Sequence, residues 1–125
     1  MALDTFPYNS HTTASDALWA GVPLVTLKGE TFASRVASSL LTTHGFPDLI
    51  AHNEGEYKKR VLELATDHDY RAQLKSALNQ ARLSSPLFDT ARFTRELEGL
   101  YRAITADHTH PANIRGAVVS AQLPL

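Results

Sequence analysis

The stretch Val22-Pro23-Leu24-Val25-Thr26-Leu27 decides the fold of this chain. It is a compact apolar run rich in β-branched residues, which is typical of a strand buried on both faces of a parallel sheet. Pro23 suits the first residues of such a strand, because a missing N–H is tolerated there. The run therefore predicts the central strand of a small sheet.

A short helix is predicted directly upstream of this strand. It covers residues 12–20 and ends at Gly21, a residue type that commonly stops helices. Residues 1–8 precede it and read as the end of another strand and its loop. A strand, a helix and the buried run thus follow one another along the chain.

The same alternation continues downstream. Residues 28–31 form a turn, and Glu30 or Thr31 opens a second helix that stops near Gly45. Residues 48–51 then form a third short strand. Alternating elements of this kind imply an α/β fold with a parallel sheet and right-handed crossovers. The apolar residues of the second helix are Phe32, Val36, Leu40 and Leu41.

Polar residues gather where the first predicted helix begins. His11, Thr12 and Thr13 lie at its start, and Asp16 lies about one turn further on. A helix N-terminus offers unpaired N–H donors and a partial positive charge, and threonine hydroxyls add further donors for an anion. Ligands of parallel sheets bind beyond the carboxyl ends of the strands. The segment therefore suits a phosphate at the helix start, with the Asp16 carboxylate on a neighbouring ribose hydroxyl.

Three other interpretations of this segment stay open at this stage. Ser10 or a threonine can act as an ordinary N-cap that satisfies the first turn. Ser10, His11 and Asp16 are also the residue types of a nucleophile triad, although no nucleophile-elbow glycines surround Ser10. His11 alone can serve as a general base, since an imidazole accepts a proton near neutral pH.

The second half of the sequence is predicted to be helical. Asn53 and Glu56 have capping-box spacing, and Asp67 can cap the helix that follows. The segment Ser84-Ser85-Pro86 interrupts this pattern, and a long final helix starts at Asp89. Its apolar stripe consists of Phe93, Leu97, Leu100, Tyr101 and Ile104. Residues 106–125 have no clean period and are predicted to be a mobile tail, in which residues 117–119 can add a short strand.

Composition narrows the classes of function. The chain has 125 residues, enough for one small domain, and its net charge of −1 gives no footprint for nucleic acid or an anionic membrane. The absence of cysteine excludes disulfides and thiolate metal sites. No apolar run approaches the ~20 residues of a membrane span. A cytoplasmic protein with no nucleic-acid or membrane partner is the expectation.

Four further residue types have a structural and a functional interpretation. The six histidines show no zinc-protease spacing, so no metal site is predicted. Trp19 is expected in the core rather than as a platform for a sugar. Arg35 is expected to pair with Glu30 rather than with a ligand. Lys28 is expected to be solvated.

Over roughly residues 3–104 the sequence resembles the catalytic region of protein O-GlcNAc transferases. The most specific part is His11-Thr12-Thr13-x-x-Asp16, followed by Gly29-Glu30-Thr31-x-x-Ser34-Arg35. Supporting segments are residues 3–13, 16–23, 29–37, 84–89 and 96–101. One position departs from the pattern, because the family usually has proline where this chain has Lys28.

The resemblance implies both a fold and an activity. The family has a GT-B architecture of two Rossmann-like lobes, and residues 1–105 correspond to the C-terminal half of the nucleotide-sugar-binding lobe. The family transfers a sugar from a nucleotide sugar, here expected to be UDP-GlcNAc, to serine or threonine hydroxyls of proteins. The transfer inverts the anomeric carbon and needs no metal.

The resemblance also implies roles for individual residues. Thr12 and Thr13 hold the diphosphate of the donor, Asp16 holds the ribose, and His11 lies beside the diphosphate. The family's first lobe and its helical repeats would lie upstream of these residues. The chain alone is therefore expected to be inactive. The alternative is a non-catalytic interaction module derived from such a lobe. The sequence does not distinguish uracil from guanine, or GlcNAc from fucose.

Overall fold

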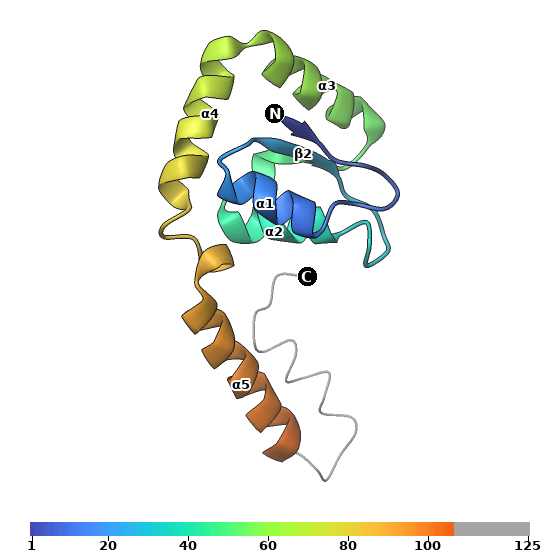
Figure 1. The fold of residues 1–125 in the computed structure, drawn as a ribbon. Coiled ribbons are helices and arrows are strands. Elements are labelled where there is room, and N and C mark those ends of the chain that lie inside the picture. Colours follow the sequence, from blue (N-terminus) through green and yellow to red (C-terminus); the bar gives the residue numbers. More distant parts are fainter. Residues whose placement is uncertain (107–125) are drawn as a thin grey trace. The chain divides into compact units, whose positions relative to one another are not determined.

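Three short parallel strands form the centre of the first part of the chain. The structure is a computed structural model that describes residues 1–106. The strands are β1 (Ala2–Leu3), β2 (Leu24–Leu27) and β3 (Ile50–Ala51), in the order β1-β2-β3. Ala2 pairs with Leu24 in the first ladder and Thr26 pairs with Ile50 in the second, both in parallel. The predicted parallel sheet is therefore present, with β2 at its centre (Figure 1).

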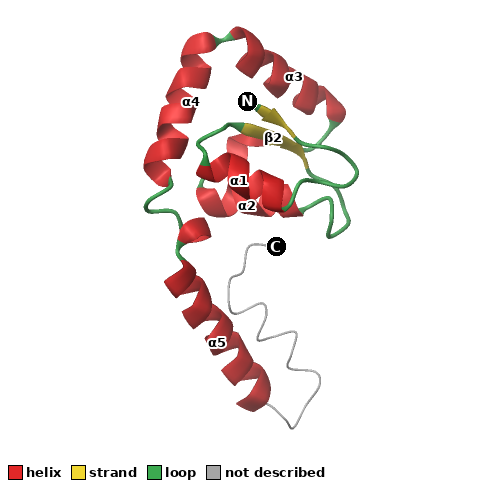
Figure 2. Cartoon of the chain, in the orientation of Figure 1, coloured by secondary structure: helices red, strands yellow, loops and turns green. Residues whose placement is uncertain are grey.

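Helices cover both faces of this sheet. Helices α1 (Thr12–Trp19) and α2 (Val36–His44) contact each other and β2, and α3 (Glu54–Thr66) packs on β2 and β3 from the opposite face (Figure 1). Helix α4 (His68–Ala81) packs against α3. Figure 2 shows how much of the chain is helix and how short the strands are. The buried apolar core consists of Ala14, Leu18, Leu24, Val25, Ala37, Leu41, Leu49, Ile50, Ala51, Leu64 and Leu78.

The central strand is buried on both faces, as the apolar run predicts. Leu24, Val25 and Thr26 are all at most 2% exposed. The strand begins two residues later than the expected Val22, since Pro23 lies just before it and contributes only its carbonyl, which accepts from the N–H of Ala2 (2.7 Å). At the third strand, residues 47–49 form a 3₁₀ turn (Pro47–Leu49), so only Ile50 and Ala51 pair.

Helix α2 begins later than predicted. The expected start was Glu30 or Thr31, but residues before Val36 form a turn stabilised by two hydroxyls. The Thr31 N–H donates to Ser34 Oγ (3.0 Å), and Ser34 Oγ donates to the Thr31 carbonyl (3.0 Å). Such local side-chain bonds compete with helical backbone bonds. Phe32, expected on the apolar face of the helix, therefore lies in the turn and is exposed.

The expected caps of α3 and α4 are confirmed. Asn53 Oδ1 accepts from the Glu56 N–H (2.9 Å), and the Glu56 carboxylate accepts in return from the His52 N–H (3.0 Å). Asp67 Oδ1 accepts from the Tyr70 N–H (2.8 Å). Helix α2 ends at Gly45, whose φ of +91° gives the left-handed conformation common after a helix.

Trp19 is not in the core, contrary to the prediction. It lies at the last residue of α1 and is 49% exposed. The Arg82 guanidinium lies 5.1 Å from its ring centre, and the Phe88 ring meets it edge-on with centroids 5.0 Å apart. The indole thus joins α1 to residues 82–88 at the surface, including the 3₁₀ turn Pro86–Phe88.

His44 is an unexpected buried polar residue. It is 4% exposed, and its ring lies against the rings of Phe46 and Phe88, with centroids 5.1 and 5.3 Å away. Neither ring nitrogen has a hydrogen-bond partner among the described residues. Burial therefore lowers the pKa of His44 below its usual 6.5.

A second unit of the chain begins at Asp89. Its described part is helix α5 (Thr90–Ala106), which begins one residue after the predicted Asp89. Asp89 Oδ1 accepts from the Arg92 N–H (2.9 Å), in the manner of an N-cap. Within α5 the side chains of Phe93 and Tyr101 are 61% and 60% exposed. The predicted tail lies outside the described residues, apart from Ala106.

No helix within residues 1–106 combines the length and the apolar character needed to cross a membrane.

The burial of His44 predicts a pH dependence of stability. The unfolded chain binds a proton near pH 6.5, whereas the folded chain resists it until the pH is lower. Stability from this residue is therefore fully present above about pH 7.5 and is lost as the pH falls through 6.5. We expect urea unfolding of the wild type to show this loss between pH 7.5 and 5.5.

The His44→Leu variant places an apolar side chain at this buried position and removes the titrating group. Its stability is expected to change less than that of the wild type over the same pH range. A His52→Leu variant serves as the control, because His52 is exposed. Identical pH profiles for His44→Leu and the wild type would contradict this interpretation of the burial.

Candidate functional site

The start of α1 presents the predicted binding residues to solvent. Thr12, Thr13 and Asp16 are all exposed, and their side chains have no hydrogen-bond or ionic partner among residues 1–106. Thr12 and Thr13 precede Asp16 by four and three residues, which places the three side chains on neighbouring positions of one helix surface. The structure therefore places these three predicted site residues together and leaves them accessible.

No side chain caps the first turn of α1. His11 occupies the N-cap position, but its side chain makes no capping hydrogen bond. The interpretation of Ser10 or a threonine as an ordinary N-cap is therefore wrong. The first backbone N–H groups of α1 remain free of side-chain acceptors, as an anion site at a helix start requires.

His11 is held between two exposed aromatic rings. Its imidazole stacks on Tyr8 with centroids 5.1 Å apart, and it meets Phe32 edge-on at 6.1 Å. Its Nε2 atom is buried and has no hydrogen-bond partner among the described residues. His11 thus lies beside the start of α1 without presenting this nitrogen to solvent.

Asp4 is a site component that the sequence analysis missed. It follows β1 and is only 7% exposed. Its Oδ1 accepts from the N–H of Thr5 (2.9 Å) and from the N–H and hydroxyl of Ser10 (both 2.6 Å), while Oδ2 accepts from the hydroxyl of Thr26 (2.6 Å). These contacts exclude the nucleophile triad of Ser10, His11 and Asp16, because the Ser10 hydroxyl donates to Asp4 rather than to His11.

Asp4 also connects the sheet to α3. Its backbone carbonyl accepts from the Tyr57 hydroxyl (3.0 Å). Burial, and secondarily the negative charge of Asp4, raise the pKa of Tyr57 above its usual value. No sequence pattern marks Asp4, since a single aspartate after a predicted strand is a common loop residue. The role of Asp4 is visible only in the structure, where the chain turns back and brings Ser10 to its carboxylate.

Asn9 joins the two loops that follow β1 and β2. It is 1% exposed, and its N–H donates to the Ala33 carbonyl (3.0 Å). Its side-chain amide donates to the Thr5 carbonyl (2.8 Å) and, at 3.5 Å, to the Leu27 carbonyl. The loop of residues 4–11 and the loop of residues 28–34 therefore form one connected edge of the sheet.

The second loop carries two residues whose roles were predicted. Lys28 is exposed, as expected, and its N–H donates to the Ala51 carbonyl (2.9 Å). Arg35 is exposed at the N-cap of α2, and no ion pair joins it to Glu30 among the described residues. The expected pairing is therefore wrong, because the turn of residues 31–34 replaces the helical spacing that it needed.

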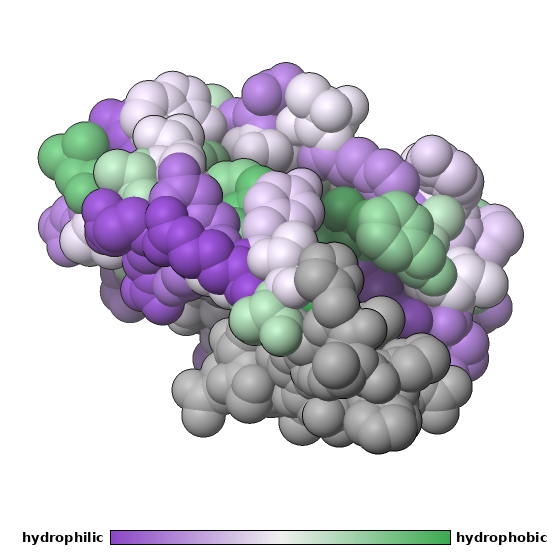
Figure 3. Space-filling model, turned by 90° about the horizontal axis from the view of Figure 1, so that it is seen from below, coloured by the Kyte–Doolittle hydropathy of each residue, from purple (hydrophilic) through white to green (hydrophobic). Residues whose placement is uncertain are grey.

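The surface around the described residues is mixed in character. On the face drawn in Figure 3, apolar residues form separate patches among hydrophilic ones. Exposed aromatic residues near the site are Phe6, Tyr8 and Phe32. Within residues 1–106 no three histidine, aspartate or glutamate side chains lie together in a way that could hold a metal ion.

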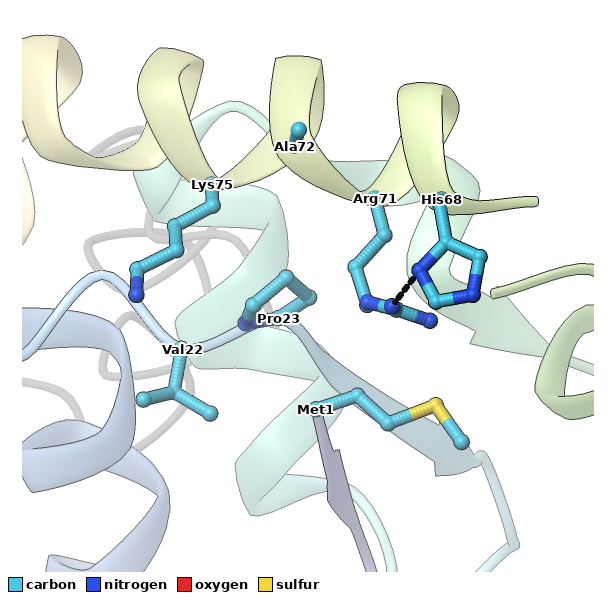
Figure 4. Close-up of a pocket in the computed structure, with 7 residues that line it drawn as sticks. All are labelled: Met1, Val22, Pro23, His68, Arg71, Ala72 and Lys75. Atoms are coloured by element: carbon cyan, nitrogen blue, oxygen red, sulfur yellow. Dashed lines mark hydrogen bonds between the residues drawn. The ribbon is translucent and has the colours of Figure 1, made fainter. Parts of the chain in front are cut away.

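A pocket of about 380 Å³ lies at the other end of the strands (Figure 4). Met1, Val22 and Pro23 line it from the sheet, and α4 contributes Arg71 and Lys75. The Arg71 guanidinium already has partners within the protein. It donates to the Leu64 and Ala65 carbonyls at the end of α3 (2.7 and 3.2 Å) and contacts His68 Nδ1 (2.6 Å). This pocket thus does not coincide with the predicted site.

Comparison with known proteins defines the class of this chain. A family profile described as glycosyl transferase family 41 matches residues 1–97. The chain therefore belongs to glycosyl transferase family 41.

Individual relatives agree with this assignment. The chain is 42% identical over 104 residues to a probable UDP-N-acetylglucosamine--peptide N-acetylglucosaminyltransferase SPINDLY of Solanum lycopersicum, covering 83% of this chain and 11% of the relative. It is 42% identical over 100 residues to the UDP-N-acetylglucosamine--peptide N-acetylglucosaminyltransferase of Caenorhabditis elegans, covering 80% and 9%. The chain thus spans about a tenth of the length of these relatives.

A solved structure supports the same fold. A mutant O-GlcNAc transferase of Thermobaculum terrenum matches with a TM-score of 0.76 and 40% sequence identity, over 82% of this chain and 20% of that one. The expected family and the expected fold class, part of a GT-B lobe with a short parallel sheet, are confirmed.

The close packing of Gly29 against Ser34, inside the loop of residues 28–34, gives a stability prediction. An added Cβ would lie 2.5 Å from Ser34 Oγ and 2.7 Å from Ser34 Cβ, and Ser34 is 2% exposed and held by its bonds to Thr31. Gly29→Ala is therefore expected to lower the free energy of unfolding by about 1–3 kcal/mol, as overpacking does.

Gly99→Ala is the matched control for this substitution. Nothing lies within 4 Å of its added Cβ, and alanine in a helix interior is expected to raise helicity. Urea unfolding followed by circular dichroism compares the two variants. A Gly29→Ala variant as stable as the wild type would show that Gly29 and Ser34 are not packed as described.

Proposed function

We propose that this chain forms the diphosphate- and ribose-binding part of the donor site of a protein O-GlcNAc transferase. The donor is UDP-GlcNAc, and the acceptors are serine and threonine hydroxyls of proteins. The observation that carries the proposal is the exposure of Thr12, Thr13 and Asp16 at an uncapped helix start. Membership of glycosyl transferase family 41 and the printed names of the relatives support the choice of donor and acceptor.

The geometry suggests how these residues act on the donor. The first N–H groups of α1 and the two threonine hydroxyls can donate hydrogen bonds to diphosphate oxygens, in the partial positive field of the helix start. Asp16 can accept from ribose hydroxyls one turn away. In this arrangement the His11 ring lies beside the diphosphate.

These contacts serve the leaving group during transfer. When the acceptor hydroxyl attacks the anomeric carbon, the bond from that carbon to the phosphate oxygen breaks and the diphosphate gains negative charge. Donors fixed in advance stabilise this charge as it develops, by about 2–4 kcal/mol for a well-placed donor. In this proposal N–H and hydroxyl donors, without a metal ion, stabilise the negative charge of the leaving diphosphate.

The complete reaction needs parts that other regions of a longer protein would supply. In the relatives this segment is about a tenth of the chain. We propose that an upstream lobe positions the acceptor and supplies the general base, and that upstream helical repeats hold the protein substrate. The alternative is a non-catalytic module that binds no donor. A cytoplasmic location stays a prediction.

A titration followed by NMR separates the contributions to donor binding. UDP and pyrophosphate, added at up to millimolar concentration, are expected to shift the amides of residues 11–14. Thr13→Val is expected to weaken both ligands about tenfold, because it removes a hydrogen bond to a charged group. Asp16→Asn is expected to weaken UDP and leave pyrophosphate unchanged, since pyrophosphate has no ribose.

Thr66→Val and Asp69→Asn are matched controls, because they make the same chemical changes in α3 and α4. Both are expected to bind UDP as the wild type does. If millimolar UDP shifts no amide of residues 11–14, the proposal fails and the non-catalytic module is favoured. If Asp16→Asn weakens pyrophosphate binding as much as it weakens UDP binding, Asp16 does not bind the ribose.

A further inference from the structure

We propose that Asp4 is a positioning residue for the donor site: its buried carboxylate fixes the path of the chain from the end of β1 to the start of α1. The inference rests on the proposed function for its ligand. It concerns a residue that never touches the ligand and acts only through Ser10 and the residues that follow it.

The Asp4 carboxylate lies among several hydrogen-bond donors. An ionised carboxylate has two oxygens and no donor, so it suits a place where several donors converge. Asp4 meets four such donors: the Thr5 N–H, the Ser10 N–H, the Ser10 hydroxyl and the Thr26 hydroxyl. Two of them come from Ser10, the residue directly before His11.

The two oxygens of the Asp4 carboxylate accept from different parts of the chain. Oδ2 faces the central strand and accepts from Thr26, which is fully buried in β2. Oδ1 faces the loop and accepts from both ends of it, at Thr5 and Ser10. The carboxylate therefore ties the loop back to the rigid part of the sheet.

Within residues 1–106, Asp4 is the side-chain hydrogen-bond partner of Ser10, and the next residue, His11, is held by ring contacts with Tyr8 and Phe32. The helix start has no side-chain cap, and the side chains of Thr12 and Thr13 are exposed without partners in the described part of the chain. Asn9 holds the preceding residue through its own bonds to Ala33 and Thr5. Between Asn9 and α1, the contacts of Ser10 with Asp4 set the direction of the chain.

A positioning role differs from a merely structural one in how variants behave. Asp4→Asn keeps an oxygen where Oδ1 lies and offers its amide N–H₂ to the Thr26 hydroxyl, which can accept as well as donate. Asp4→Ala removes every one of these contacts. Positioning therefore predicts rescue by asparagine, whereas a requirement for the negative charge itself predicts equal loss in both variants.

The experiment measures UDP affinity by NMR titration of the whole chain. Asp4→Ala is expected to bind UDP about tenfold more weakly than the wild type, while Asp4→Asn stays within about threefold. Asp67→Ala is the matched control, because it also removes an aspartate that accepts from a backbone N–H, at the start of α4. It is expected to lower stability and leave UDP affinity unchanged.

Two outcomes would overturn the proposal while UDP binding to the wild type is observed. One is a folded Asp4→Ala variant that binds UDP as tightly as the wild type. The other is equal weakening in Asp4→Asn and Asp4→Ala. If Asp4→Ala does not fold, Ser10→Ala replaces it, with an expected weakening of about threefold from the loss of one hydroxyl bond. Unchanged affinity in Ser10→Ala would then overturn the proposal.

Failure of the proposed function gives a separate result. If the wild type binds no UDP, the donor-site assignment falls and the positioning role is read from the amide shifts of residues 11–14 without ligand. Asp4→Ala is then expected to move these shifts, and Asp67→Ala is not. Unmoved shifts in Asp4→Ala would show that the carboxylate does not set the start of α1.

Discussion

The burial of β2 on both faces is the constraint on which the rest of the structure depends. A strand with helices on both faces and a parallel partner on each side has no exposed surface to carry polar groups, so the chemistry is moved to its ends. The loops after β1 and β2 then meet at one edge. There Asp4 and Asn9 satisfy backbone and hydroxyl groups that would otherwise be unpaired, and α1 begins beside them.

This arrangement leaves the helix start available for a ligand. The donors of Ser10 are used by Asp4, whereas the two threonines that follow it make no side-chain bond within the described residues. Ser10 and the two threonines after His11 thus differ in their side-chain contacts. Asp4 is buried with both carboxylate oxygens hydrogen-bonded, whereas Thr12, Thr13 and Asp16 are exposed and make no side-chain hydrogen bond within the described residues.

The sequence allowed the prediction of features that depend on local patterns. The run at β2 is apolar throughout, and the caps at Asn53 and Asp67 act on N–H groups three residues away. The late start of α2 could not be predicted, because the bonds between Thr31 and Ser34 compete with an equally plausible helix. Trp19 was misplaced for a related reason: its partners Arg82 and Phe88 lie more than sixty residues away in the sequence. The role of Asp4 could not be predicted, because its partners belong to the end of a loop and to a neighbouring strand. At the site, the residue types of Thr12, Thr13 and Asp16 could be selected from sequence, but their exposure required the structure.

A crystal structure of the chain with bound UDP would show whether the donor binds at the start of α1. We predict that the diphosphate lies within hydrogen-bond distance of the first N–H groups of α1 and of the hydroxyls of Thr12 and Thr13, with the ribose beside Asp16. UDP seated instead in the pocket beside α4, or absent from the start of α1 at saturating concentration, would contradict it.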